Sequence, residues 1–164
     1  MMERHACQRA HGGDGFTLPG AEASYAPDLA LEPRHIDVAL RLDLDAETAS
    51  GTVTTTVRAN RAGARELVLD AVSFEDVAVE EPEDWRYDGE RIRLCWAQPF
   101  SKGEERTVAV TYAVRSPVTG MHFSRPDEAY PDRALFVATD HETARARCWL
   151  PRAPYPTARA TSAR

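Results

Sequence analysis

The sequence predicts an all-β domain, an antiparallel two-sheet β-sandwich, on the basis of three observations. Apolar and polar residues alternate with a period of two over several stretches, which is the pattern of strands with one wet face. Glycine, proline and aspartate separate these stretches at intervals of roughly 8–12 residues, as in sandwiches. No stretch shows a convincing amphipathic helical period. Together these features favour packed sheets over a helical or mixed fold.

The first two strands follow each other directly. Residues 36–44 place Ile, Val and Leu at every second position, with His35, Asp37, Arg41 and Asp43 between them. Residues 45–50 then lead to a turn at Gly51, and residues 53–59 alternate again between Val or Thr and more polar positions. The threonines favour a strand because a branched Cβ packs well on a pleated surface and is stiff in a helix.

The middle of the chain predicts two short strands, at residues 67–69 and 77–79, and then a hairpin. Trp85 and Tyr87 lead into Asp88-Gly89, and Ile, Leu and Trp alternate over residues 92–96 on the way out. Asp-Gly suits a tight turn because glycine tolerates a positive φ and aspartate bonds to the nearby backbone.

A further strand is predicted at residues 108–114, where Val, Val, Tyr and Val alternate with smaller or polar residues. Residues 117–131 contain three prolines and a glycine, so we expect an irregular crossing before a last short strand at residues 135–137.

Length and charge limit the classes of function. The chain has 164 residues, which is the size of one domain. Its net charge is −6, Lys102 is its only lysine, and no basic stripe interleaves with aromatic residues. We therefore expect no nucleic-acid partner. No run of apolar residues approaches the length of a membrane span, and residues 1–19 lack the apolar core of a signal peptide.

The three cysteines, Cys7, Cys95 and Cys148, are widely spaced and include no C-x-x-C pair. An odd number of scattered cysteines favours a reduced protein, and we expect a cytoplasmic location. Residues 1–24 are rich in glycine and lack large apolar groups, which predicts a flexible N-terminal arm. Residues 25–156 are expected to form the β-sandwich domain.

Residues 139–156 carry the most specific motif. Thr139 and Glu142 are followed by Ala146-Arg147, then by Leu150-Pro151, and later by Pro156. This spacing resembles the end of the N-terminal domain in zinc aminopeptidases of the aminopeptidase N and leukotriene hydrolase type, the gluzincin metallopeptidases. Two earlier stretches resemble the same family: Tyr25-x-Pro27 with Pro33-x-His35, and Tyr112 with Gly120-Met121-x-Phe123-Ser124.

The resemblance implies a saddle-shaped, two-sheet β domain that is itself noncatalytic. It would support a catalytic domain of the same full-length protein, and residues 157–164 would begin the linker to that domain. The resemblance also implies that the acidic side chain of Glu142 binds the free α-amino group at the N-terminus of a peptide substrate. A carboxylate suits that task because it forms a strong charge-assisted hydrogen bond with an ammonium group.

Asp140 stands where the family usually has Gln. It could add negative potential to the amine site, or cap a turn by accepting bonds from nearby backbone amides, and we favour the cap. His141 is expected at the surface, Arg147 is expected to brace the loop, and Cys148 with Trp149 is expected to pack inward. We count Glu142 and Asp140 as the candidate substrate-binding residues.

The sequence has no H-E-x-x-H, the helical motif that binds zinc in these peptidases. The string His141-Glu142-Thr143-Ala144-Arg145 ends in an arginine, which stays protonated and cannot ligate a metal. We expect no catalytic residue, metal site or cofactor in this chain. Zinc would belong to the catalytic domain, and the chain alone would be inactive.

Two further readings compete with a peptidase domain. The family pattern Pro-Cys-x-Asp-x-Pro would place Cys at position 152 and Asp at position 154, whereas this chain has Arg152 and Pro154. This departure favours a catalytically dead interaction or scaffold module of the same fold, like the subunit associated with the TATA-binding protein. A generic sandwich used for adhesion or sugar binding would show the same strand pattern.

Overall fold

The computed structural model describes residues 29–142, 144–154 and 160–164, and the statements below concern these residues. The predicted arm at residues 1–24 and the motif residues Tyr25, Pro27 and Pro156 lie outside them. Within the described ranges the elements are β1 (Leu31–Asp43), β2 (Thr48–Ala59), β3 (Glu66–Asp70), β4 (Glu75–Val79), β5 (Asp84–Tyr87), β6 (Arg91–Cys95), β7 (Glu105–Arg115), β8 (Met121–Ser124), β9 (Phe136–Thr139), the 3-10 helix η1 (Arg145–Cys148) and β10 (Ser162–Ala163).

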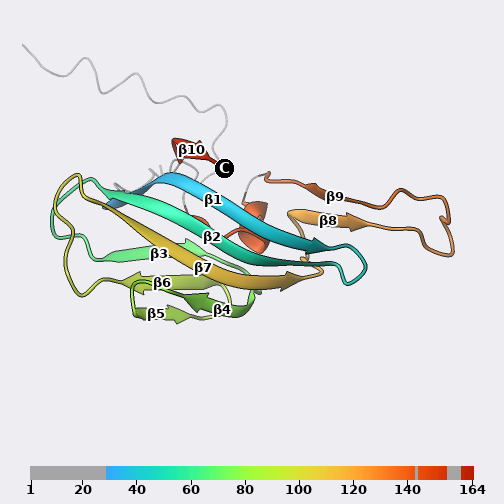
Figure 1. Ribbon diagram of the computed structural model, residues 1–164, viewed down its shortest axis with the longest axis horizontal. Coiled ribbons are helices and arrows are strands. Elements are labelled where there is room, and N and C mark those ends of the chain that lie inside the picture. Colours follow the sequence, from blue (N-terminus) through green and yellow to red (C-terminus); the bar gives the residue numbers. More distant parts are fainter. Residues whose placement is uncertain (1–28, 143, 155–159) are drawn as a thin grey trace, which may run out of the picture.

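The strands form two stacked sheets and a separate hairpin, which confirms the all-β sandwich (Figure 1). The larger sheet has the order β10-β1-β2-β7-β4, and the smaller sheet has the order β3-β6-β5. All pairs of these strands are antiparallel except β1 with β10, which is parallel. The hairpin β8–β9 extends beyond one end of the larger sheet (Figure 1).

The core lies between the two sheets and is formed by the predicted period-2 positions. Val53 and Val57 of β2 and Val108 and Val110 of β7 are buried in the larger sheet, and Ile92 and Leu94 of β6 are buried in the smaller one. Tyr112 joins this layer and stacks on Phe74 with a centroid distance of 4.4 Å. Because alternate residues face opposite sides of a strand, the threonines of β2 at positions 52, 54 and 56 face outward.

Strand β1 differs from its prediction in length and in burial. It begins at Leu31, five residues before the predicted start, and its pairing with β2 shifts register between Pro33 and His35. After the shift Ile36 and Val38 lie opposite the buried Thr55 and Val53 of β2, and with Leu40 they pack, partly buried, against the core. Leu42, near the end of the strand, is 45% exposed. The burial of β1 therefore decreases toward its C-terminal end.

The edges of both sheets have specific closures. At one edge of the larger sheet β10 pairs with His35 and Ile36 of β1. Strand β10 lies within residues 157–164, which were expected to begin a linker. At the other edge β4 is short, and its pairing with β7 shifts register between Glu75 and Ala78. In the smaller sheet β3 is covered by Arg152, whose backbone bonds to that of Asp70 in both directions, and β5 is left free.

In the described part of the chain, no helix has the length and hydropathy needed to cross a bilayer.

Candidate functional site

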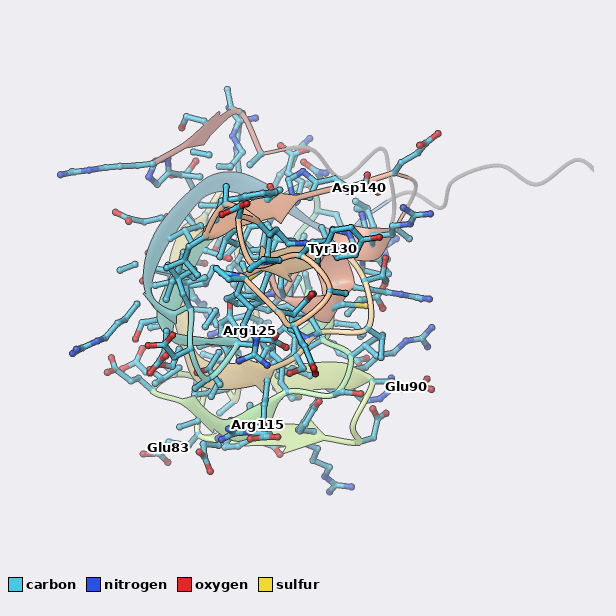
Figure 2. All side chains as sticks on the ribbon, turned by 90° about the vertical axis from the view of Figure 1, so that its right-hand side faces the viewer. Glu83, Glu90, Arg115, Arg125, Tyr130 and Asp140 are labelled. Atoms are coloured by element: carbon cyan, nitrogen blue, oxygen red, sulfur yellow. The ribbon has the colours of Figure 1, made fainter. Side chains whose placement is uncertain are left out.

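The motif residues 139–154 start at the end of strand β9. They form a loop, the 3-10 helix η1 and an extended segment at residues 150–154, which we call the strap. Strand β9 ends at Thr139, and the Asp140 amide continues its ladder by donating to the Gly120 carbonyl oxygen at 2.9 Å. Figure 2 looks onto the end of the molecule that carries this hairpin, with Asp140, Tyr130 and Arg125 labelled. The loop therefore starts from a fixed strand end.

Asp140 holds the first turn of the loop. Its Oδ1 accepts a hydrogen bond from the Glu142 amide at 3.1 Å, and its Oδ2 accepts one from the Arg145 guanidinium. The Glu142 amide and then the Arg145 side chain lower the pKa of the Asp140 carboxyl below its ordinary value. These contacts are those of the predicted turn cap. A direct part for Asp140 in binding stays a prediction.

Glu142 is exposed and borders a shallow depression of about 430 Å³. The same depression is lined by Thr119, Ala144, Arg145, Arg147 and Cys148. Among the described residues the Glu142 carboxylate has no ion-pair partner. Its backbone is fixed through Asp140 while its side chain faces solvent, so it is available to a ligand or to a neighbouring domain.

The 3-10 helix η1 is anchored to the sandwich through main-chain carbonyl groups. The Arg147 carbonyl accepts from the Val72 amide at 2.8 Å, and the Trp149 carbonyl accepts from the Tyr112 hydroxyl at 2.6 Å. Burial raises the pKa of Tyr112, so this hydroxyl keeps its proton. Arg147 therefore holds the loop through its carbonyl. The predicted bracing by its guanidinium is wrong, because that group is exposed on the depression and makes no hydrogen bond or ion pair among the described residues.

Cys148 of η1, Trp149 and His141 lie as the sequence predicts. Cys148 is 6% exposed, and burial raises the pKa of its thiol, which is the state of an inert packed cysteine. Trp149 packs against the core and carries His141 on its ring at a centroid distance of 5.5 Å. His141 itself is exposed, as predicted.

Gly120 has a structural role that the sequence reasoning missed. Its φ of +84° favours glycine, and a Cβ atom there would lie 2.3 Å from the Arg145 carbonyl oxygen. Gly120 therefore allows η1 to lie directly on the start of β8. Its place in the motif Gly120-Met121 was visible in the sequence, but the contact with Arg145 depends on how the loop returns to the hairpin.

The departures from the family pattern are accommodated by the strap at residues 150–154. Arg152 accepts a bond from the Asp70 amide at 2.7 Å and donates one to the Asp70 carbonyl at 3.1 Å. Because these are backbone bonds, they do not require a cysteine at position 152. The Arg152 Nε atom is buried and lacks a hydrogen-bond partner within the described residues.

The described residues contain no group of three or more His, Cys, Asp or Glu side chains that could hold a metal ion. Glu142 and Asp140 lie on one loop, whereas His35 and His122 lie on two other elements, β1 and β8. A zinc ion therefore has no fitting ligand set in the described part of this chain.

The curved sandwich with its hairpin and strap is the fold of the N-terminal part of M1 zinc metallopeptidases and of leukotriene A4 hydrolase. Native leukotriene A4 hydrolase from Saccharomyces cerevisiae is similar over 82% of this chain and 23% of its own, with 19% identity and a TM-score of 0.63. An M1 zinc metallopeptidase from Deinococcus radiodurans, solved with a Tyr-Ser-Ala substrate, is similar over 81% of this chain and 31% of its own, with 22% identity and a TM-score of 0.60.

These likenesses concern the fold, since the identities are below a quarter. The chain spans only 22% to 32% of the length of such structures. No protein-family model matches the sequence. A comparison with curated proteins also gives no match.

Proposed function

We propose that this chain is a noncatalytic domain that packs against a zinc-dependent aminopeptidase domain and helps to recognise the N-terminus of a peptide substrate. Glu142 would bind the α-amino group, and Asp140 would hold Glu142 in position. The observation that carries the proposal is the exposed Glu142 carboxylate on a loop whose backbone is fixed to β8, β9 and η1. Rigid support of an exposed charged group is typical of a binding residue.

The charges around Glu142 indicate that the proposed site is completed by another domain. The depression contains the guanidinium groups of Arg145 and Arg147 beside the Glu142 carboxylate. Asp140 neutralises Arg145, which leaves the region without the excess negative charge that attracts an ammonium group. Further acceptors for the amine would come from the catalytic domain, together with the zinc ion.

Uncovered apolar surface supports a partner domain. On β1, Leu42 is 45% exposed, and at the hairpin end Tyr130, Leu135 and Phe136 are 61%, 52% and 50% exposed. Leu135 and Phe136 are adjacent in the chain, and exposed apolar groups that gather in a patch commonly mark protein interfaces. The hairpin is also fixed to the β1–β2 turn, because Arg125 donates to the Asp45 carbonyl at 3.1 Å.

The same apolar surface favours a second candidate, an interaction module without peptidase activity. In that case the hairpin would bind another protein, and Glu142 would have no substrate. The strap supports this candidate as well, since its pairing with β3 persists without the Cys and Asp of the peptidase pattern. For either role we propose a cytoplasmic location, because Cys95 and Cys148 are free thiols.

A chimera separates the two candidates. Residues 1–164 would replace the N-terminal domain of the Deinococcus radiodurans metallopeptidase, and kcat/KM would be measured on a peptide with a free N-terminus. We expect Glu142→Gln to lower kcat/KM by about 10–150-fold, the loss of one charge-assisted hydrogen bond of roughly 1.5–3 kcal/mol.

The matched control is Glu90→Gln, which removes a similarly exposed carboxylate from the β5–β6 turn (Figure 2). Unchanged kcat/KM in both variants of an active chimera would reject amine recognition by Glu142 and favour the interaction module. A chimera that folds and binds zinc but is inactive with the wild-type residue would lead to the same conclusion.

A further inference from the structure

A groove lined by four arginines lies between the strap and the outer face of the smaller sheet. Arg91 and Arg93 come from β6, Arg147 comes from η1, and Arg152 comes from the strap. We call this feature, with a volume of about 530 Å³, the arginine groove. It adjoins the depression at Glu142, since Ala144 and Arg147 border both.

The arginine groove has an excess of positive charge. Of the described residues, two acidic ones line it, Asp70 and Glu66, against four arginines. The Arg91 Nε atom lies 3.4 Å from Asp70 Oδ1, and Arg93 lies 3.8 Å from Glu66. For Arg147 and Arg152 no ion pair occurs among the described residues. This excess stands out in a chain whose net charge is −6.

The strand register concentrates these cations instead of dispersing them. Asp70 is the cross-strand partner of Arg91 on one side and forms a backbone bridge with Arg152 on the other, and within the described residues its carboxylate forms an ion pair with Arg91. In a neighbouring row Arg93 lies directly opposite Arg86 of β5. Like charges in such cross-strand pairs destabilise a sheet. A bound anion would offset this repulsion.

Arg152 supplies an independent indication. Its Nε atom is buried and has no hydrogen-bond partner within the described part of the chain. A buried donor without an acceptor is unfavourable, whereas an acceptor bound in the groove would satisfy it. Arginine is well suited to this task because its planar fork can donate two parallel bonds to a phosphate or a carboxylate.

We propose that the arginine groove binds a small molecule with at least two anionic oxygen groups, either phosphates or carboxylates. Its volume lies in the range of small-ligand sites, and leucine and proline side chains form part of its wall. Among the described residues that line it there is no aromatic side chain on which a base could stack. The proposal is independent of amine recognition at Glu142, which requires the opposite charge.

Isothermal titration calorimetry on the 164-residue chain tests the proposal. Pyrophosphate and citrate serve as probes at constant ionic strength, one for phosphate and one for carboxylate chemistry. We expect one saturable site for at least one probe, and we expect Arg147→Gln to weaken its binding about tenfold. The preferred probe identifies the source of the anionic groups.

The control variant is Arg115→Gln, which removes an exposed arginine of the larger sheet that is paired with Glu75 (Figure 2). Binding should be unchanged in this variant. Absence of saturable binding up to about 10 mM of either probe, or equal weakening by both variants, overturns the proposal.

Nuclear magnetic resonance provides a test that does not depend on a variant at position 152, where a change could disturb the strap. In the 15N-labelled chain, the Nε–H resonance of Arg152 should shift on saturation with the bound probe. A shift confined to the Arg115 resonance, with Arg152 unmoved, would exclude the groove as the site.

Discussion

Replacing Gly120 with alanine should loosen the loop that carries Glu142. At a φ of +84° an alanine costs about 1–2 kcal/mol relative to glycine. The new Cβ would also lie 2.3 Å from the Arg145 carbonyl oxygen and 3.2 Å from Cδ1 of Trp149. At 2.3 Å the Cβ would clash with a backbone atom, so η1 must move, at a cost of about 1–3 kcal/mol. The expected loss in the free energy of unfolding is therefore about 2–5 kcal/mol.

Gly63→Ala is the matched control. Gly63 has a φ of +85°, and a Cβ atom there would meet nothing within 4 Å. This variant carries the backbone cost alone, so its loss should be about 1–2 kcal/mol. Urea unfolding followed by circular dichroism measures both values. Equal losses in the two variants would refute the conclusion that Gly120 is required by the contact with η1.

Further predictions concern the contacts that hold the loop. Tyr112→Phe should lower the free energy of unfolding by about 1–3 kcal/mol in urea, because it leaves the Trp149 carbonyl without its donor. The wild-type chain should lose stability above about pH 10, where tyrosine ionises in the unfolded chain but Tyr112, its pKa raised by burial, stays neutral in the folded one. In Tyr112→Phe this loss should be smaller; an identical pH profile would argue against it. Finally, Arg145→Gln should raise the pKa of Asp140 in a 13C titration, since it removes one of the groups that lower it, and an unmoved pKa would show that Arg145 has no part in the lowering.

The strands were predictable where burial on one face imposes strict alternation. Residues 108–114 fall within β7, and residues 92–96 overlap β6, since both strands cross the core. The Asp-Gly turn was also predictable, because Asp88 bonds to the backbone amides of residues 90 and 91. In each case the signal is local, within a few residues of the element that it specifies.

The early start of β1 and the sheet membership of β4 were not predictable. Pro33 obscures the first part of β1, and the register shift after it appears only when β2 is paired. A strand was predicted at residues 77–79, but its partner was not. Strand β4 pairs with β7, which lies about thirty residues later in the chain. Local sequence patterns do not determine which strands become neighbours.

The candidate site was predictable only in its first turn. The cap by Asp140 follows from its position at a strand end and was favoured from the sequence. The arginine groove was not predictable, because β7, the hairpin β8–β9 and η1 separate Arg93 from Arg152 along the chain. Their proximity is a product of the fold, which brings the strap against β3.

The free edges of the two sheets also bear on self-association. Strand β4 is short and irregular, and it is followed by Glu80 and Glu81, while β5 begins at Asp84 directly after Glu83. Unpaired edges recruit other chains, and like charges beside them keep two copies apart. Replacing these four carboxylates with amides would remove that repulsion and let copies of the chain join edge to edge into aggregates while the sandwich is still folded.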